Sequence, residues 1–134
     1  TWKGWRICPL VCYDLRFPVW SRNRWDATQK ALEYALLVYV ANWPKPRVSA
    51  WDTLLRARAM ENLSFVAGVN RTGPDAEGIV YNGHSAVIDP RGSALSEAGE
   101  EEVIHSSVLD AESLRAHREK FPAYLDSDLF HLEP

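Results

Sequence analysis

Three short apolar runs, separated by segments long enough for helices, most constrain how this chain can fold. They occupy residues 5 to 11, 36 to 42 and 63 to 70, and glycine, proline or polar residues bound them. Runs of this length and composition are typical of buried strands. Their alternation with helical segments predicts an α/β layered fold rather than a bundle or a sandwich of sheets.

The segments that follow the first two runs carry helix signals. Pro18 suits the first turn of a helix, and we expect that helix to continue to Ala35. Ser49 is a candidate N-cap for a second helix that ends near residue 62, because apolar residues recur there at helical spacing.

The C-terminal part of the sequence predicts smaller elements. We expect a loop over residues 71 to 78, a hairpin over 84 to 98 that turns at Asp89–Gly92, and a strand over 102 to 109. Asp110 is the expected cap of a final helix, residues 111 to 120.

Composition describes an ordinary globular chain. It has 134 residues, 46% of them hydrophobic, and a formal net charge of −3. No apolar run approaches the ~20 residues that cross a bilayer, and no basic-then-apolar leader is present, so we expect a cytoplasmic protein without a membrane partner. Scattered basic residues and mild acidity argue against a nucleic-acid partner. Because Thr1 lies almost directly before the first strand, we expect the sequence to begin in the middle of a protein.

The two cysteines cannot form a disulfide on an extended strand. Cys8 and Cys12 are four residues apart, which is roughly 13 Å in a strand and beyond the ~7 Å limit between Cα atoms. The four histidines show no zinc-type spacing, and we expect neither a metal nor another cofactor; they are His84, His105, His117 and His131.

Cys12 stands where the first strand hands over to the next segment. Free cysteine most often packs as a small hydrophobe, and by position alone that interpretation leads. A strand-to-helix turn also exposes a reactive side chain above a sheet, and the backbone N–H of Tyr13 would then face the same spot as an oxyanion donor. Position therefore leaves both interpretations open.

Five sequence blocks in order decide between them. They are CYDLRFP, VANWP, RARAMEN, VAGVNRTG and GHSAVIDPRG. In order and spacing the chain resembles the C-terminal half of the nitrilase superfamily of carbon–nitrogen hydrolases, and within it the omega-amidase-like branch. One departure is RWDATQKALEYALL, residues 24 to 37, which looks longer than its family counterpart and is expected to extend the helix after the cysteine.

The resemblance implies half of a four-layer αββα sandwich and a cysteine nucleophile, here Cys12, that forms a thioester with an amide or nitrile carbon. The family's general-base glutamate and oxyanion-stabilising lysine both lie upstream of the cysteine, outside this chain. Lys3 is too close to the nucleophile to replace that lysine, and Glu61 does not replace the glutamate. Residues 1 to 134 are therefore expected to form the C-terminal part of a single hydrolase domain, inactive without the N-terminal half.

Four further residues are candidates for contact with substrate. Arg16 is either a carboxylate anchor, as the resemblance implies, or the partner of Asp14 in a local cap and ion pair. Asn42, Trp43 and Arg47 follow the second strand, where α/β folds place ligand-contacting loops; for Arg47 a solvent-facing role is equally open.

Two other pairs have simpler interpretations. Arg58 and Glu61 are three residues apart on a predicted helix and are expected to form a structural ion pair. A cysteine-protease-like dyad of His84 with Cys12 is disfavoured, because no signature of that class surrounds either residue.

The sequence thus predicts hydrolysis of small linear amides, with omega-amides of short dicarboxylic or keto acids as preferred substrates. The alternatives are a nitrile or N-carbamoyl amino acid hydrolase, or a catalytically inactive interaction or dimerisation fold. The resemblance also implies a homodimer formed through helices within residues 17–35 and 50–62.

Overall fold

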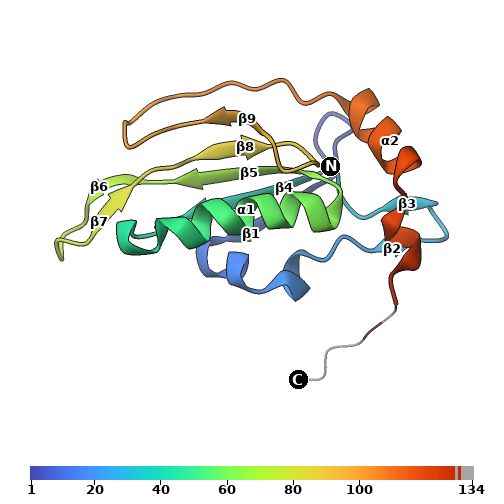
Figure 1. Cartoon of the computed structure of the whole chain (residues 1–134), viewed down its shortest axis with the longest axis horizontal. Coiled ribbons are helices and arrows are strands. Elements are labelled where there is room, and N and C mark those ends of the chain that lie inside the picture. Colours follow the sequence, from blue (N-terminus) through green and yellow to red (C-terminus); the bar gives the residue numbers. More distant parts are fainter. Residues whose placement is uncertain (129, 131–134) are drawn as a thin grey trace.

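The computed structural model describes residues 1 to 128 and 130, and His131 therefore lies outside the described residues. Its centre is a five-stranded sheet in the order β1-β4-β5-β8-β9 (Figure 1). The parallel strands are β1 (Ile7–Val11), β4 (Leu36–Ala41) and β5 (Phe65–Asn70). The antiparallel strands β8 (Ala86–Ile88) and β9 (Ala94–Glu97) complete the sheet. The α/β prediction is confirmed.

Among residues 1 to 128 the remaining elements are short, apart from two α-helices. α1 (Val48–Asn62) covers one face of the sheet, and α2 (Ala111–Lys120) lies beside the β2–β3 ribbon (Figure 1). The two-residue strands of that ribbon are β2 (Trp25–Asp26) and β3 (Ala31–Leu32), and β6 (Thr72–Pro74) pairs with β7 (Val80–Asn82). The described part of the chain also contains the 3₁₀ turns η1 (Cys12–Arg16), η2 (Pro18–Ser21), η3 (Lys45–Arg47) and η4 (Ala123–Asp126).

Close approach of α1 to the sheet forms the core. Trp51 and Leu55 are almost fully buried, and they pack over Gly68 of β5. A Cβ atom at residue 68 would lie 2.5 Å from Leu55 Cδ1 and 2.8 Å from Trp51 Cζ2. Glycine is therefore needed here for space.

We expect Gly68→Ala to destabilise the intact protein by about 1–3 kcal/mol, because the added methyl overpacks a filled core. Urea unfolding measures the change. Gly99→Ala is the control, because Gly99 is exposed and its added methyl would meet only the movable end of the Glu101 side chain. Equal stability of Gly68→Ala and the wild type would contradict this packing.

The opposite face of the sheet carries a row of exposed valines. Val11, Val40 and Val69 stand in register on adjacent strands. Their exposed fractions are 66%, 57% and 51%, which is high for apolar residues in the strands of a sheet. The two faces therefore differ sharply, since only one is covered by α1.

The predicted helix from Pro18 to Ala35 is wrong. The chain forms the turn η2 and then the β2–β3 ribbon, because a buried polar contact overrides local helix propensity. The amide of Asn23 donates to the Tyr34 carbonyl and accepts from the Tyr34 N–H, each at 3.0 Å. This pairing closes a loop where a helix would have kept the two residues apart.

Smaller predictions had mixed outcomes. The three buried strands, the Asp89 hairpin, the Asp110 cap and the two free thiols are confirmed. Ser49 lies inside α1, whose N-cap is Arg47, so that cap prediction is wrong. Residues 71 to 78 contain β6, and residues 102 to 109 form no strand; Ile104 there is 96% exposed and pairs with no neighbouring strand. No helix in the described part of the chain is both long and apolar enough to cross a membrane.

Candidate active site

Cys12 occupies a strained position at the carboxyl end of β1. Its φ of +43° lies in the left-handed region that side-chain-bearing residues seldom adopt. Such strain is stored mostly at functional sites, and the sharp turn from strand to η1 resembles a nucleophile elbow. Asp14 secures the turn, since its carboxylate accepts from the Val11 N–H at 2.9 Å. The predicted local cap at Asp14 is confirmed.

The ends of β1 and β4 bring the predicted residues together. The two strands are parallel neighbours, so their carboxyl ends meet at one edge of the sheet. The half-buried Cys12 Sγ lies 3.8 Å from the carbonyl oxygen of Asn42, to which it donates. Tyr13 follows in η1, with its exposed ring edge-on to Phe17 at 5.2 Å. Cys12, Tyr13 and Asn42 therefore share one edge.

Trp43 links this edge to Arg16. The guanidinium of Arg16 lies over the Trp43 ring, 4.9 Å from its centroid, while the ring also packs on Trp51 at 5.6 Å. Within residues 1 to 128 and 130 no ion pair joins Arg16 to Asp14, so that part of the local interpretation is wrong. The stack holds the Arg16 charge beside the turn that carries Cys12.

The loop after β4 is fixed by hydrogen bonds at both ends. The Trp43 indole N–H donates to the Arg47 carbonyl at 2.8 Å, while the Arg47 side chain is exposed. Asn70, at the end of β5, was not predicted to matter. Its buried amide accepts from the Trp43 N–H at 2.7 Å and donates to the carbonyls of Trp43 and Gly83 at 3.0 and 2.8 Å. The sequence feature that points to Asn70 is its position in VAGVNRTG, one of the five blocks that resemble the family.

Arg58 braces the cysteine turn from α1. Its side chain is buried, and its Nη2 donates to the Leu15 carbonyl of η1 at 2.6 Å. The predicted pair with Glu61 is confirmed at 3.0 Å. The Glu61 carboxylate accepts hydrogen bonds from Arg58 and Asn62, so it holds the Arg58 side chain in position. The turn that carries Cys12 is thus anchored to the core helix.

His84 has a different partner from the one a protease-like dyad requires. Its Nδ1 lies 3.2 Å from the Asp52 carboxylate, and its carbonyl accepts from the Trp51 indole N–H at 2.8 Å. The residue therefore ties the loop before β8 to α1. In the described part of the chain, no group of three or more His, Cys, Asp and Glu side chains is arranged to hold a metal ion.

Comparison with known proteins identifies the class. The carbon-nitrogen hydrolase family model matches residues 2 to 119, so the chain belongs to the carbon–nitrogen hydrolase family. The predicted resemblance to the omega-amidase branch is confirmed at the level of sequence: the chain is 52% identical to omega-amidase YafV of Escherichia coli K12, over 98% of this chain and 49% of that protein. It is 44% identical to 2-oxoglutaramate amidase of Bacillus subtilis, over 92% of this chain and 45% of that one.

Solved structures agree in fold. The CN-hydrolase superfamily protein XC1258 of Xanthomonas campestris, which holds an arsenic adduct in its active site, superposes with a TM-score of 0.96. It is 53% identical, and the match covers 99% of this chain and 51% of that one. An amidase mutant from Nesterenkonia sp. AN1, with acrylamide added to its active-site cysteine, gives a TM-score of 0.69 at 32% identity, covering 93% and 47%. The chain spans about half the length of the curated relatives it matches.

Proposed function

We propose that this chain is the C-terminal half of an omega-amidase-like enzyme that hydrolyses small linear amides. The single observation that carries the proposal is Cys12, a strained cysteine at the end of a central strand, braced by Asp14 and Arg58. The relatives named omega-amidase and 2-oxoglutaramate amidase support the reaction class. The acrylamide adduct on the cysteine of the Nesterenkonia amidase supports a thiol nucleophile.

In the proposed reaction the Cys12 thiolate attacks the amide carbon. The Tyr13 N–H donates to the oxygen that becomes negative, while the family's lysine from the other half supplies the second donor. The family's glutamate takes the thiol proton and passes it to the leaving nitrogen, so ammonia departs and a thioester remains. Water then attacks the thioester, which releases the acid and restores the thiol.

The exposed row of Val11, Val40 and Val69 supports the proposal that a second layer from the other half of the protein covers this face. An exposed apolar row of this kind is normally covered, and the relatives are about twice as long as this chain. We place the other half of the αββα sandwich on this face. The 134 residues alone are therefore expected to be inactive, because base and lysine are both absent.

Arg16 is the proposed anchor for a substrate carboxylate. Its guanidinium is planar and held over Trp43, so it can offer a bidentate fork beside Cys12. The exposed side chains of Asn42 and Arg47 complete the proposed substrate end. The Trp43 ring, which is buried in the core, supports Arg16 and does not itself face the substrate. An enzyme with such an anchor would prefer amides that carry a free carboxylate.

Assembly and location are further proposals. We place a homodimer contact on segments 17–35 and 50–62, although the first holds turns and a ribbon rather than a helix. Trp20, Phe17 and Met60 support this choice, since they expose 59%, 42% and 54% of their surface there. We place the enzyme in the cytoplasm, without cofactor, nucleic acid or membrane.

Turnover by the full-length protein tests the function. We expect ammonia release from an omega-amide of a keto acid to exceed release from its methyl ester, because the ester lacks the charge that Arg16 binds. Arg16→Gln should lower kcat/KM for the acid by about 10-fold or more and leave the ester nearly unchanged.

Two parallel assays decide between the alternatives. Faster turnover of a nitrile or an N-carbamoyl amino acid would replace the omega-amide assignment. Absence of turnover on all three substrate classes would favour the inactive interaction fold.

A further inference from the structure

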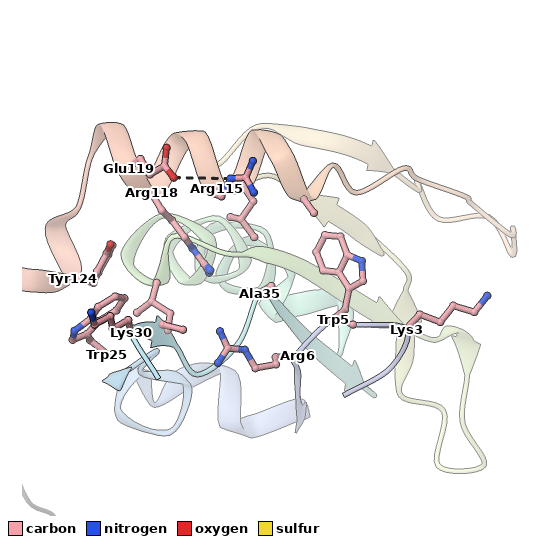
Figure 2. A pocket seen from close by; sticks show the side chains of 15 residues that line it. Lys3, Trp5, Arg6, Trp25, Lys30, Ala35, Arg115, Arg118, Glu119 and Tyr124 are labelled. Atoms are coloured by element: carbon pink, nitrogen blue, oxygen red, sulfur yellow. Dashed lines mark ion pairs between the residues drawn. The ribbon is translucent and has the colours of Figure 1, made fainter. Parts of the chain in front are cut away.

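A cavity lies at the opposite end of the parallel strands from Cys12. It measures about 580 Å³ and is bounded by the residues before β1, the β2–β3 ribbon and α2 (Figure 2). Arg6 and Ala35 line it from just before β1 and β4, whereas Cys12 and Asn42 come just after those strands. The cavity is therefore separate from the candidate active site.

Its lining has an excess of positive charge in a chain whose net charge is −3. The charged lining residues are Lys3, Arg6, Lys30, Arg115, Arg118 and Glu119. Glu119, the acidic residue of this lining, forms an ion pair with Arg115, whose Nε lies 3.9 Å from the Glu119 carboxylate. No ion pair within residues 1 to 128 and 130 involves Arg6, Lys30 or Arg118.

Arg118 is held rigidly at the cavity by neutral acceptors. Its Nε donates to the Leu63 carbonyl at 2.8 Å and its Nη2 to the Tyr34 carbonyl at 2.9 Å. Figure 2 shows Arg118 extending from α2 and Arg6 from the segment before β1 toward the same space. Burial, and then the charge of Arg6, lower the pKa of Arg118 to about 10, so the Arg118 guanidinium remains charged at neutral pH. An anion between them would relieve this repulsion.

Aromatic side chains supply apolar walls. Trp5 and the stacked pair of Trp25 and Tyr124, whose ring centroids lie 4.8 Å apart, line the cavity with Leu32 and Leu114. Small-molecule sites commonly combine such walls with a few polar groups in volumes of about 300–1,000 Å³. The cavity suits a small organic molecule that bears a negatively charged group.

We propose that this cavity binds a small organic anion with at least two negative charges, a phosphate ester or a dicarboxylate. Both groups accept paired hydrogen bonds from guanidinium, the chemistry that Arg6 and Arg118 share. Lys30 adds a further charge from the β2–β3 ribbon. The site is independent of the proposed amide hydrolysis, because its lining residues lie at the other end of the sheet.

Calorimetric titration of the full-length protein tests the proposal with three probes. AMP represents a phosphate ester, succinate represents a dicarboxylate, and adenosine carries the ring without the charge. We expect AMP or succinate to bind. The tighter binder of the two shows whether the ligand is a phosphate ester or a dicarboxylate. Arg6→Gln and Lys30→Gln should each weaken that binding about 10-fold. Arg91→Gln and Lys120→Gln remove the same charges from exposed positions outside the cavity and should leave binding unchanged.

Three results would overturn the proposal. They are failure of both anions to bind, binding that Arg6→Gln and Lys30→Gln leave intact, and adenosine binding as tight as that of AMP. Because the titration measures binding without turnover, none of these results depends on whether the protein hydrolyses amides.

Discussion

Cys12→Ala should abolish ammonia release from omega-amides in the full-length protein, with kcat lowered on the order of 10⁶-fold. The thiol forms the bond that splits amide hydrolysis into two steps, and alanine has no atom that can form it. Loss of volume is small, and the braces from Asp14 and Arg58 act on the backbone of the turn, so the fold should persist. Turnover assays and circular dichroism measure the two effects.

Cys8→Ala is the matched control. Cys8 lies on β1, the strand that leads into the Cys12 turn, and it packs against the core. Burial, and then the charge of Glu33, raise the pKa of Cys8, which keeps that thiol protonated at neutral pH. We expect Cys8→Ala to retain turnover and iodoacetamide to label Cys12 first. Full activity of Cys12→Ala would remove Cys12 from the mechanism.

Apolar periodicity predicted the central sheet, because its strands owe their conformation to burial. Residues 36 to 41 and 65 to 70 form strands where the sequence places them, within a few residues. The segment from Pro18 to Ala35 was mispredicted as a helix, since it is fixed by hydrogen bonds between Asn23 and both Tyr34 and Asn62. Contacts between residues this far apart leave no periodic trace in the sequence.

In the candidate active site, too, some features could be predicted from the sequence and others depend on distant contacts. Cys12, Asn42 and Trp43 are found together because parallel strands end at one edge, which the sequence pattern already implied. The supporting roles of Asn70 and Arg58 could not be predicted, because each acts on backbone atoms of a distant segment. A polar residue in a strand or helix end gives little indication of which carbonyl it will meet.

Arg58→Met should destabilise the protein on the order of 3 kcal/mol and also impair turnover. Methionine preserves much of the volume, but it leaves the buried Leu15 carbonyl without its donor and Glu61 without its partner. Because Leu15 belongs to η1, the turn that carries Cys12 should loosen even in molecules that remain folded. Arg58→Lys should not restore turnover, since one ammonium cannot reproduce the guanidinium fork across both partners.

Arg56→Met separates this brace from a general effect of charge on α1. Arg56 lies on the same helix, pairs with Glu97 and donates to the Gly92 carbonyl at 2.7 Å, but its side chain is 38% exposed and both of these partners lie outside the cysteine turn. Exposed pairs contribute about 0–1 kcal/mol, so this variant should unfold at nearly the wild-type urea concentration and keep its kcat. Equal losses in Arg56→Met and Arg58→Met would show that the Leu15 contact has no special role. A stable Arg58→Met variant with normal kcat would mean that Asp14 alone holds the cysteine turn.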